Sequence, residues 1–186
     1  GNYVYSPCEV WTNGTIRNLS FIDRTDNEHH TQEAGSSFAY AVHSDWGTCK
    51  TRFENCYMYS NAGPAIGLGT RADEKLEFYN CRFVSDCDGT FGSTGQGAFF
   101  AHVATTTTST PNQNLLVQDS IAIANLQTHG GKLTVVDQSY QGTWNYEFRN
   151  VGFFGQNGAD VSLVDNTETS ILSRFNFNNV PAVLNA

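Results

Sequence analysis

The sequence has little charge for its length, and most of that charge is negative. Charged residues make up 15% of the 186 positions, only three of them are lysine, and the formal net charge is −8. No cluster of Lys or Arg is present to neutralise phosphates, so we expect no nucleic-acid partner. No apolar run is long enough to cross a bilayer, so we expect no membrane insertion. Asn, Thr, Ser and Gly take the place of charge, and such a polar surface suits many-stranded folds and contacts with sugars.

Paired Cys-x-x-Cys motifs are also missing, so the chain lacks the ligand spacing of a zinc site, and we expect no metal and no cofactor. We interpret the cysteines as buried reduced thiols, because a chain of this length does not need disulfides for stability; a disulfide framework is the alternative. No signal peptide precedes Gly1 and the composition is uniform, so we expect one domain, residues 1–186, excised from a longer chain. The five cysteines are Cys8, Cys49, Cys56, Cys81 and Cys87.

What the sequence does contain is a degenerate repeat. Each copy reads apolar, any residue, Asn-like, small or apolar, any residue, apolar. The copies are IRNLSF (16–21), FENCYM (53–58), FYNCRF (78–83), VQDSIA (117–122), FRNVGF (148–153) and LSRFNF (172–177). Their third positions form a column of Asn18, Asn55, Asn80, Asp119, Asn150 and Arg174. We expect this column to lie where each strand bends, because Asn side chains hydrogen-bond a bent backbone and each other.

A second short apolar segment follows each copy, in an order that never changes. These segments are FAYAVHSD (38–45), PAIGLGTR (64–71), GAFFAHVA (97–104), KLTVVDQ (132–138), DVSLVDN (160–166) and PAVLNA (181–186). Alternating apolar residues over such lengths predict half-buried strands, and no segment keeps the apolar period of a helix. Without crossover helices, each strand must stack on its counterpart one repeat later. We therefore predict an all-β, right-handed parallel β-helix, a solenoid of about six coils. An antiparallel sandwich is the alternative, which the rarity of Asn-Gly and Asp-Gly turns disfavours.

The repeated segments resemble the pectin-lyase-like superfamily of right-handed parallel β-helices, and in character the β-helix domains of bacteriophage tailspikes and tail appendages. FENCYM and FYNCRF carry the resemblance most clearly, VQDSIA and FRNVGF are weaker copies, and together the copies cover nearly the whole chain. The motif identifies a fold and not a chemistry. The resemblance implies a surface that binds or cuts long polysaccharides, a homotrimer, and a place on the virion surface or otherwise outside the cell.

Polar residues of the second segments form a rough column that could carry chemistry. Stacked strands would place Asp137 and Asp165 about 5 Å apart, the separation of the two carboxylates in a retaining glycosidase. Their like charges would raise the pKa of one of them, which would create an acid. We therefore take Asp137 and Asp165 as candidate catalytic residues; solvated strand ends are the alternative. The candidate ligand-binding residues are His43, Asp45, Arg71, His102 and Trp144.

Aromatic residues at strand edges and turns are candidates for sugar binding. Sugar rings present C–H faces that pack on aromatic planes, while Asn and Thr side chains bind the hydroxyls. The alternative is that Trp11 and Trp144 cap core layers or face a neighbouring subunit. The aromatic candidates are Trp11, Trp46, Trp144, Tyr57, Tyr59 and Tyr140.

Three functions are compatible with these patterns. Our leading hypothesis is a virion-surface module, like a tailspike or tail appendage, that binds host cell-surface polysaccharide. The second is a polysaccharide depolymerase, either a lyase or a glycoside hydrolase, that uses Asp137 and Asp165. The third is a structural spacer of a tail fibre. Whether the chain is an enzyme is left open by the sequence.

Overall fold

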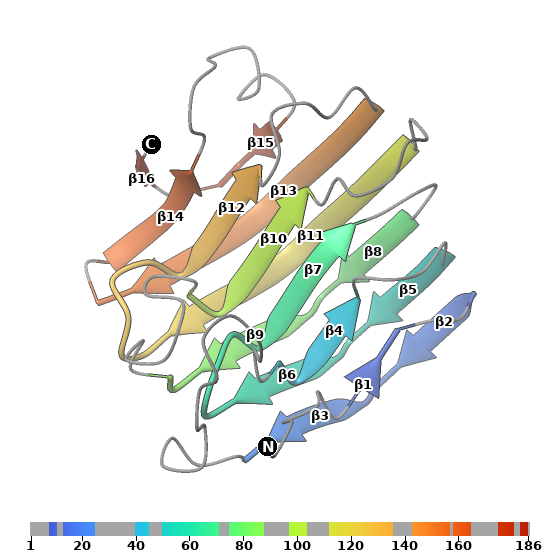
Figure 1. Cartoon of the computed structure of the whole chain (residues 1–186), viewed down its shortest axis with the longest axis horizontal. Helices are drawn as coiled ribbons and strands as arrows, with labels where there is room; N and C mark the ends of the chain where they lie inside the picture. The colour runs from blue at the N-terminus through green and yellow to red at the C-terminus, as the bar shows by residue number, and fades with distance from the viewer. Residues whose placement is uncertain are drawn as a thin grey trace.

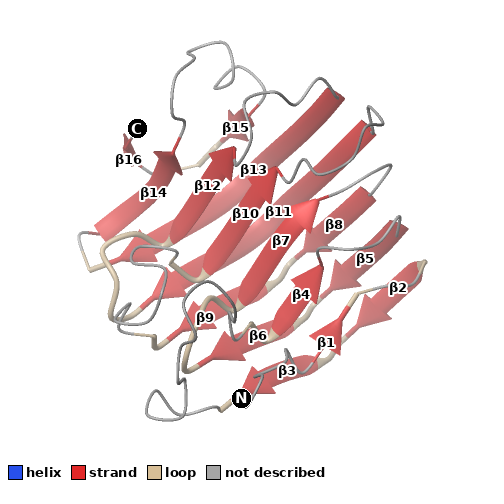
Figure 2. Ribbon diagram, viewed as in Figure 1, coloured by secondary structure: helices blue, strands red, loops and turns tan. Residues whose placement is uncertain are grey.

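The computed structural model is built of strands, and the part of the chain that it describes contains no helix (Figure 2). The described residues are 8–10, 13–24, 40–44, 50–70, 75–87, 97–103, 112–135, 143–156, 158–164, 175–180 and 183–185. The strands are β1 (Cys8–Glu9), β2 (Gly14–Arg17), β3 (Ser20–Asp23), β4 (Val42–Ser44), β5 (Lys50–Glu54), β6 (Tyr57–Ser60), β7 (Ile66–Thr70), β8 (Lys75–Tyr79), β9 (Arg82–Ser85), β10 (Phe99–Val103), β11 (Asn112–Ala124), β12 (Gly131–Val135), β13 (Thr143–Gly155), β14 (Gly158–Val164), β15 (Phe175–Asn178) and β16 (Val183–Asn185).

The strands lie in two layers, and the strands of one layer run opposite to those of the other (Figure 1). The first layer has the order β1-β4-β7-β10-β12-β14-β16, and the second has the order β2-β5-β8-β11-β13-β15, with β3, β6 and β9 continuing it beside β11. Neighbours within each layer pair in parallel, and the described antiparallel pairing of strands joins β13 to β14 at Phe154 and Ala159. This all-β arrangement of stacked parallel strands fits a β-helix or solenoid, as the repeat predicts.

The register of the second layer follows the predicted repeat. Phe53 of β5 pairs with Phe78 of β8, and their rings stack 5.0 Å apart. One residue beyond these strands, the Nδ2 of Asn80 donates to the Oδ1 of Asn55 at 2.8 Å. The stacking of FENCYM on FYNCRF is therefore confirmed at the level of side chains.

The last copy of the repeat was placed wrongly by the sequence pattern. Phe148 pairs with Phe177 rather than with a residue of the 172–174 region. Asn179 therefore continues the Asn column, with a positive φ of 53° and its Nδ2 2.9 Å from the Oδ1 of Asn150. Arg174, the predicted member, lies outside the described residues. The last copy therefore begins at Phe177 and reads FNNV, not LSRFNF. The sequence alone permitted the wrong alignment, because Phe175 and Phe177 both satisfy an alternating apolar pattern.

Between the layers lies a core dominated by phenylalanine. Phe148 and Phe177 stack with centroids 5.3 Å apart, and Val117 of β11 fills the level between Phe78 and Phe148. In both columns β11 therefore places a small side chain between two phenylalanines, because Ala122 likewise lies between Phe83 and Phe153 in the neighbouring column. These small side chains leave a gap in the stack of rings.

Phe99 of β10 reaches across from the opposite layer into this gap. It makes edge-to-face contacts with the rings above and below, and it is fully buried. Its centroid lies 6.4 Å from Phe78, 5.1 Å from Phe83, 5.9 Å from Phe148 and 6.2 Å from Phe153. One large side chain thus compensates for two small ones on β11, as close packing of a core requires.

The cysteines agree with the prediction of reduced thiols wherever they are described. Cys56, Cys81 and Cys87 are buried, Cys8 is half-buried, and none of the four is in a disulfide. Burial raises the pKa of Cys81 to about 11, so its thiol is protonated and unreactive at neutral pH. Cys49 lies outside the described residues.

Candidate functional site

A ladder of Asn side chains marks the corner at which each strand of the second layer bends. The residues of the column all have a left-handed backbone, with φ between 51° and 57°, a conformation that Asn and Asp adopt more readily than other side chains with a Cβ. In this ladder, the Nδ2 of each Asn donates to the Oδ1 of its counterpart one repeat earlier. The distance is 3.2 Å from Asn55 to Asn18 and 2.8 Å from Asn150 to Asp119. The ladder is interrupted between Asn80 and Asp119, because a carboxylate has no N–H to donate. The corner divides the outer surface of this layer into two parts with different chemistry.

On the side that precedes the corner, the outer surface is charged and the charges are paired. Arg17 of β2 and Arg52 of β5 both contact the carboxylate of Glu54, and hydrogen bonding from Arg17 chiefly lowers the pKa of that carboxyl. On the same side, Lys75 lies 2.8 Å from Glu77 and Arg149 lies 2.6 Å from Glu147. Solvent-exposed pairs of this kind contribute little stability, and we interpret this part as ordinary solvated surface.

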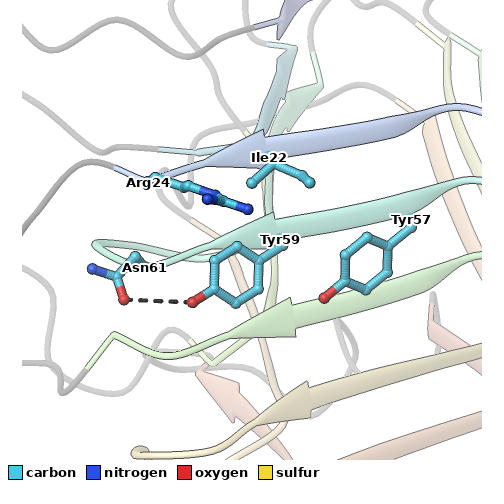
Figure 3. A pocket seen from close by; sticks show the side chains of 5 residues that line it. All are labelled: Ile22, Arg24, Tyr57, Tyr59 and Asn61. Carbon is cyan, nitrogen blue, oxygen red and sulfur yellow. Dashed lines mark hydrogen bonds between the residues drawn. The ribbon is translucent and has the colours of Figure 1, made fainter.

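Beyond the corner, the outer surface carries a groove with aromatic walls (Figure 3). The groove encloses about 440 Å³. Tyr57 and Tyr59 alternate along β6 with the buried Met58 and Ser60, so both rings face outward. Their centroids are 6.5 Å apart and their planes differ by 18°, and Figure 3 shows the two rings side by side. The lining residues are Ile22, Arg24, Tyr57, Tyr59 and Asn61.

Tyr57 and Tyr59 together form a tyrosine platform, and hydrogen bonds hold it at the hydroxyl of Tyr59. The hydroxyl of Tyr59 donates to Oδ2 of Asp86 at 2.7 Å and lies 3.5 Å from Oδ1 of Asn61. The other oxygen of Asp86 accepts from Nδ2 of Asn125 at 2.6 Å. Burial, followed by the hydrogen bond to Asp86, raises the pKa of Tyr59 to about 12. Tyr59 therefore keeps its proton at neutral pH, and its hydroxyl is held by the hydrogen bond to Asp86.

The apolar character of this surface continues along the stack of strands. The registers place Tyr59 beside Ile22 on one side and Val84 on the other, and the same row continues to Ile123 and Phe154. Ile22 and Phe154 are 42% and 37% exposed. The ring of Phe154 lies over Gly152, where a Cβ would come within 2.5 Å of it. Flat apolar surface bordered by amide, hydroxyl and guanidinium groups can pack against a ring and hydrogen-bond its substituents.

Of the ligand-binding residues predicted from sequence, His43 is described in full. It lies half-buried on β4 and its ring stacks on Tyr40 at 5.0 Å with parallel planes. His43 pairs with Gly67, whereas His102 of β10 pairs with Gly69, so the two histidines lie two residues out of register. Trp144 belongs to β13 in the other layer, where its backbone pairs with Gln113. The described strands therefore do not bring His43, His102 and Trp144 together.

The remaining predicted positions lie outside the described residues: Asp45, Arg71, Asp137 and Asp165. In the described pairing of β12 with β14, each residue lies beside the one 30 positions later, as Thr134 lies beside Val164. Asp165, in contrast, follows Asp137 by 28 positions, so the two carboxylates differ by two positions from that pairing. The pair stays a prediction. Trp11, Trp46 and Tyr140 are also outside the described residues.

Sequence reasoning identified Tyr57 and Tyr59 but missed the polar residues around them. Arg24, Asn61, Asp86 and Asn125 occupy equivalent places, since each directly follows a strand residue in the register Asp23–Ser60–Ser85–Ala124. Each also lies six residues after a member of the Asn column, at Asn18, Asn55, Asn80 and Asp119. Extending the repeat alignment by a few positions would have revealed this second polar column.

Comparison with known proteins adds no assignment. No family model matches the chain, and neither a curated protein nor a solved structure matches it. Within the described ranges, no group of three or more His, Cys, Asp or Glu side chains could hold a metal ion, and no helix is long and apolar enough to cross a membrane. The groove is therefore interpreted from its own chemistry.

Proposed function

We propose that the chain is a carbohydrate-binding module, folded as a right-handed parallel β-helix of about six coils, whose Tyr57–Tyr59 groove binds host cell-surface polysaccharide. The right hand follows from the strong preference of parallel strand connections for that hand. One observation carries the functional proposal. Two tyrosine rings lie side by side, outward and within 18° of parallel, with a fixed hydroxyl at one end.

Sugars suit this surface better than other ligands do. A pyranose ring offers an apolar face to an aromatic plane and hydroxyls to the polar groups at its edge. Here Asn61 and Asp86 supply those edge groups, and Ile22 extends the apolar floor. The groove is open to solvent rather than enclosed, which suits a polysaccharide better than a small molecule that needs an enclosed cavity.

The biological setting of the proposal rests on the resemblance of the repeated segments to tailspike β-helices. On that basis we place the module on a virion surface, outside the cell, and as part of a homotrimer. Cleavage of the polysaccharide by Asp137 and Asp165, and a purely structural role as a spacer, are the alternatives that the experiment must separate.

The experiment is affinity electrophoresis of the full chain through gels that contain one soluble polysaccharide each, with dextran, mannan, xylan, polygalacturonate, alginate and hyaluronan as probes. We expect at least one probe to retard the protein, and Tyr57→Ala to weaken that retention about fivefold, since one stacked ring contributes about 1 kcal/mol. Tyr79→Ala is the matched control, because Tyr79 lies in the same layer on the charged side of the corner, under the guanidinium of Arg52 at 4.0 Å. The control should leave retention unchanged.

Three results would count against binding at this groove. Retention of no probe would favour a spacer, and equal loss in both tyrosine variants would mean that the effect is not local. A release of new reducing ends that Asp137→Asn abolishes would instead support the depolymerase.

A further inference from the structure

We infer that the ligand of the Tyr57–Tyr59 groove is an anionic glycan, one whose sugars carry carboxylate or sulfate groups, and that Arg24 and Arg82 bind those groups. This inference rests on the proposed function and narrows it. It starts from the distribution of cations over the outer surface of the second layer.

Most cations of this layer are already neutralised by a neighbour. Arg17 and Arg52 contact Glu54, Lys75 contacts Glu77, and Arg149 contacts Glu147. All of these pairs lie on the side of the Asn corner away from the groove. In a chain with a net charge of −8, such pairing is expected, because carboxylates outnumber cations.

Arg24 and Arg82 are different, since both side chains are exposed and neither forms an ion pair within the described part of the chain. Lys50 also forms none there, but it begins β5 on the charged side of the corner. Among the described residues, the arginines of this layer without an ion pair are therefore Arg24 and Arg82, which lie beside the tyrosine platform.

The strand order places these two arginines on opposite sides of the platform. Strand β6 lies between β3 and β9. Arg24 follows β3 and lines the groove near Tyr59 (Figure 3). Arg82 begins β9, where it is the direct register partner of Tyr57. A ligand that covers both rings would thus meet one guanidinium group at each of two diagonal corners.

Guanidinium groups are well suited to this task, because their planar fork makes two parallel hydrogen bonds to a carboxylate or a sulfate. Asp86 is a carboxylate beside the platform, and both of its oxygens already accept hydrogen bonds, one from Tyr59 and one from Asn125. Asp86 would repel an acidic group on the β9 side of the hydroxyl of Tyr59, so the acidic groups of the ligand should lie at Arg24, on the β3 side, and at Arg82 beside Tyr57.

A nucleic acid fits the same charges poorly. Its affinity depends on many neutralised phosphates, whereas this groove offers two guanidinium groups in a strongly acidic chain. The aromatic platform and the sparse cations together favour a polysaccharide with intermittent acidic groups.

The test compares probes that share one backbone: neutral dextran, carboxymethyl-dextran and dextran sulfate, together with alginate, hyaluronan and mannan. In affinity electrophoresis of the full chain we expect retention by at least one anionic probe and weaker or no retention by the neutral ones. Whether carboxylated or sulfated probes retard the protein identifies the acidic group. Arg24→Gln and Arg82→Gln should each weaken that retention about tenfold, as loss of a hydrogen bond to a charged group does.

Arg149→Gln is the matched control and should leave retention unchanged, because Arg149 is exposed in the same layer but paired with Glu147. Unchanged thermal unfolding of the Gln variants verifies that they fold. The inference is overturned if neutral probes bind as well as anionic ones, or if both groove variants retain full affinity. In either case, glycan binding at the groove still stands if Tyr57→Ala weakens retention by the probes. If no probe retards the wild-type protein, both proposals fail.

Discussion

Phe99 is the residue whose replacement should damage the fold most. It is fully buried and contacts four other phenylalanine rings edge to face, at centroid distances from 5.1 to 6.4 Å. Replacing a core Phe by Ala costs about 3–5 kcal/mol, and each edge-to-face pair adds about 0.5–1.5 kcal/mol beyond burial. We therefore expect Phe99→Ala to lose ~5 kcal/mol of unfolding free energy, the upper end of that range.

The reason for this cost can be tested by a second substitution. Val117 lies on β11 between Phe78 and Phe148, at the level that the ring of Phe99 fills from the opposite layer. Val117→Phe alone should overpack the core and cost about 1–3 kcal/mol. In the Phe99→Ala background, the new ring should occupy the vacated space and complete the stack of phenylalanines.

Urea unfolding of the wild type, both single variants and the double variant gives the coupling free energy. We expect the double variant to be at least ~2 kcal/mol more stable than the sum of the single effects predicts. If Phe99→Ala does not fold, Phe99→Leu, with a smaller loss of about 1–2 kcal/mol, serves in the same cycle. Additive effects within about 0.5 kcal/mol would refute the compensation.

Two further predictions concern the corner and the groove. Asn80→Ala should lose about 1–2 kcal/mol in urea unfolding, because alanine is strained in the left-handed backbone; Asn80→Gly should lose less, and the reverse order would contradict the role given to the φ of 51°. The pKa of Tyr59 is raised from 10.0 to about 12, so its contribution to stability is complete below pH 10 and is lost as the pH rises toward 12. An ultraviolet titration of the folded chain should contain a tyrosine that ionises near pH 12, and Tyr59→Phe should remove it; an unchanged titration would contradict the raised pKa of Tyr59.

Much of the fold was predictable because the backbone imposes a periodic demand on the sequence. Each bend requires a left-handed residue, and Asn18, Asn55, Asn80 and Asn150 meet that demand visibly. The last copy was misplaced because its flanking phenylalanines fit two alignments. The contribution of Phe99 was not predictable either, since the depth to which one layer reaches into the other depends on side-chain sizes on β11.

The candidate site was predictable only in part. Tyr57 and Tyr59 could be recognised as aromatics on the outer positions of a strand with alternating burial. The alignment of six-residue copies missed Arg24 and Asp86, because it ended before their positions and each belongs to a different copy, so that only the register brings them beside Tyr59. The pairing of Asp137 with Asp165 depends on residues beyond the described ladder and stays a prediction.

The most direct test of glycan binding at the tyrosine groove is a crystal structure of the chain with an oligosaccharide cut from a probe that retards it. We predict sugar rings over Tyr57 and Tyr59, with an acidic substituent within hydrogen-bond distance of Arg24 or Arg82. An oligosaccharide bound instead along the opposite layer, against β12 and β14, would contradict this assignment.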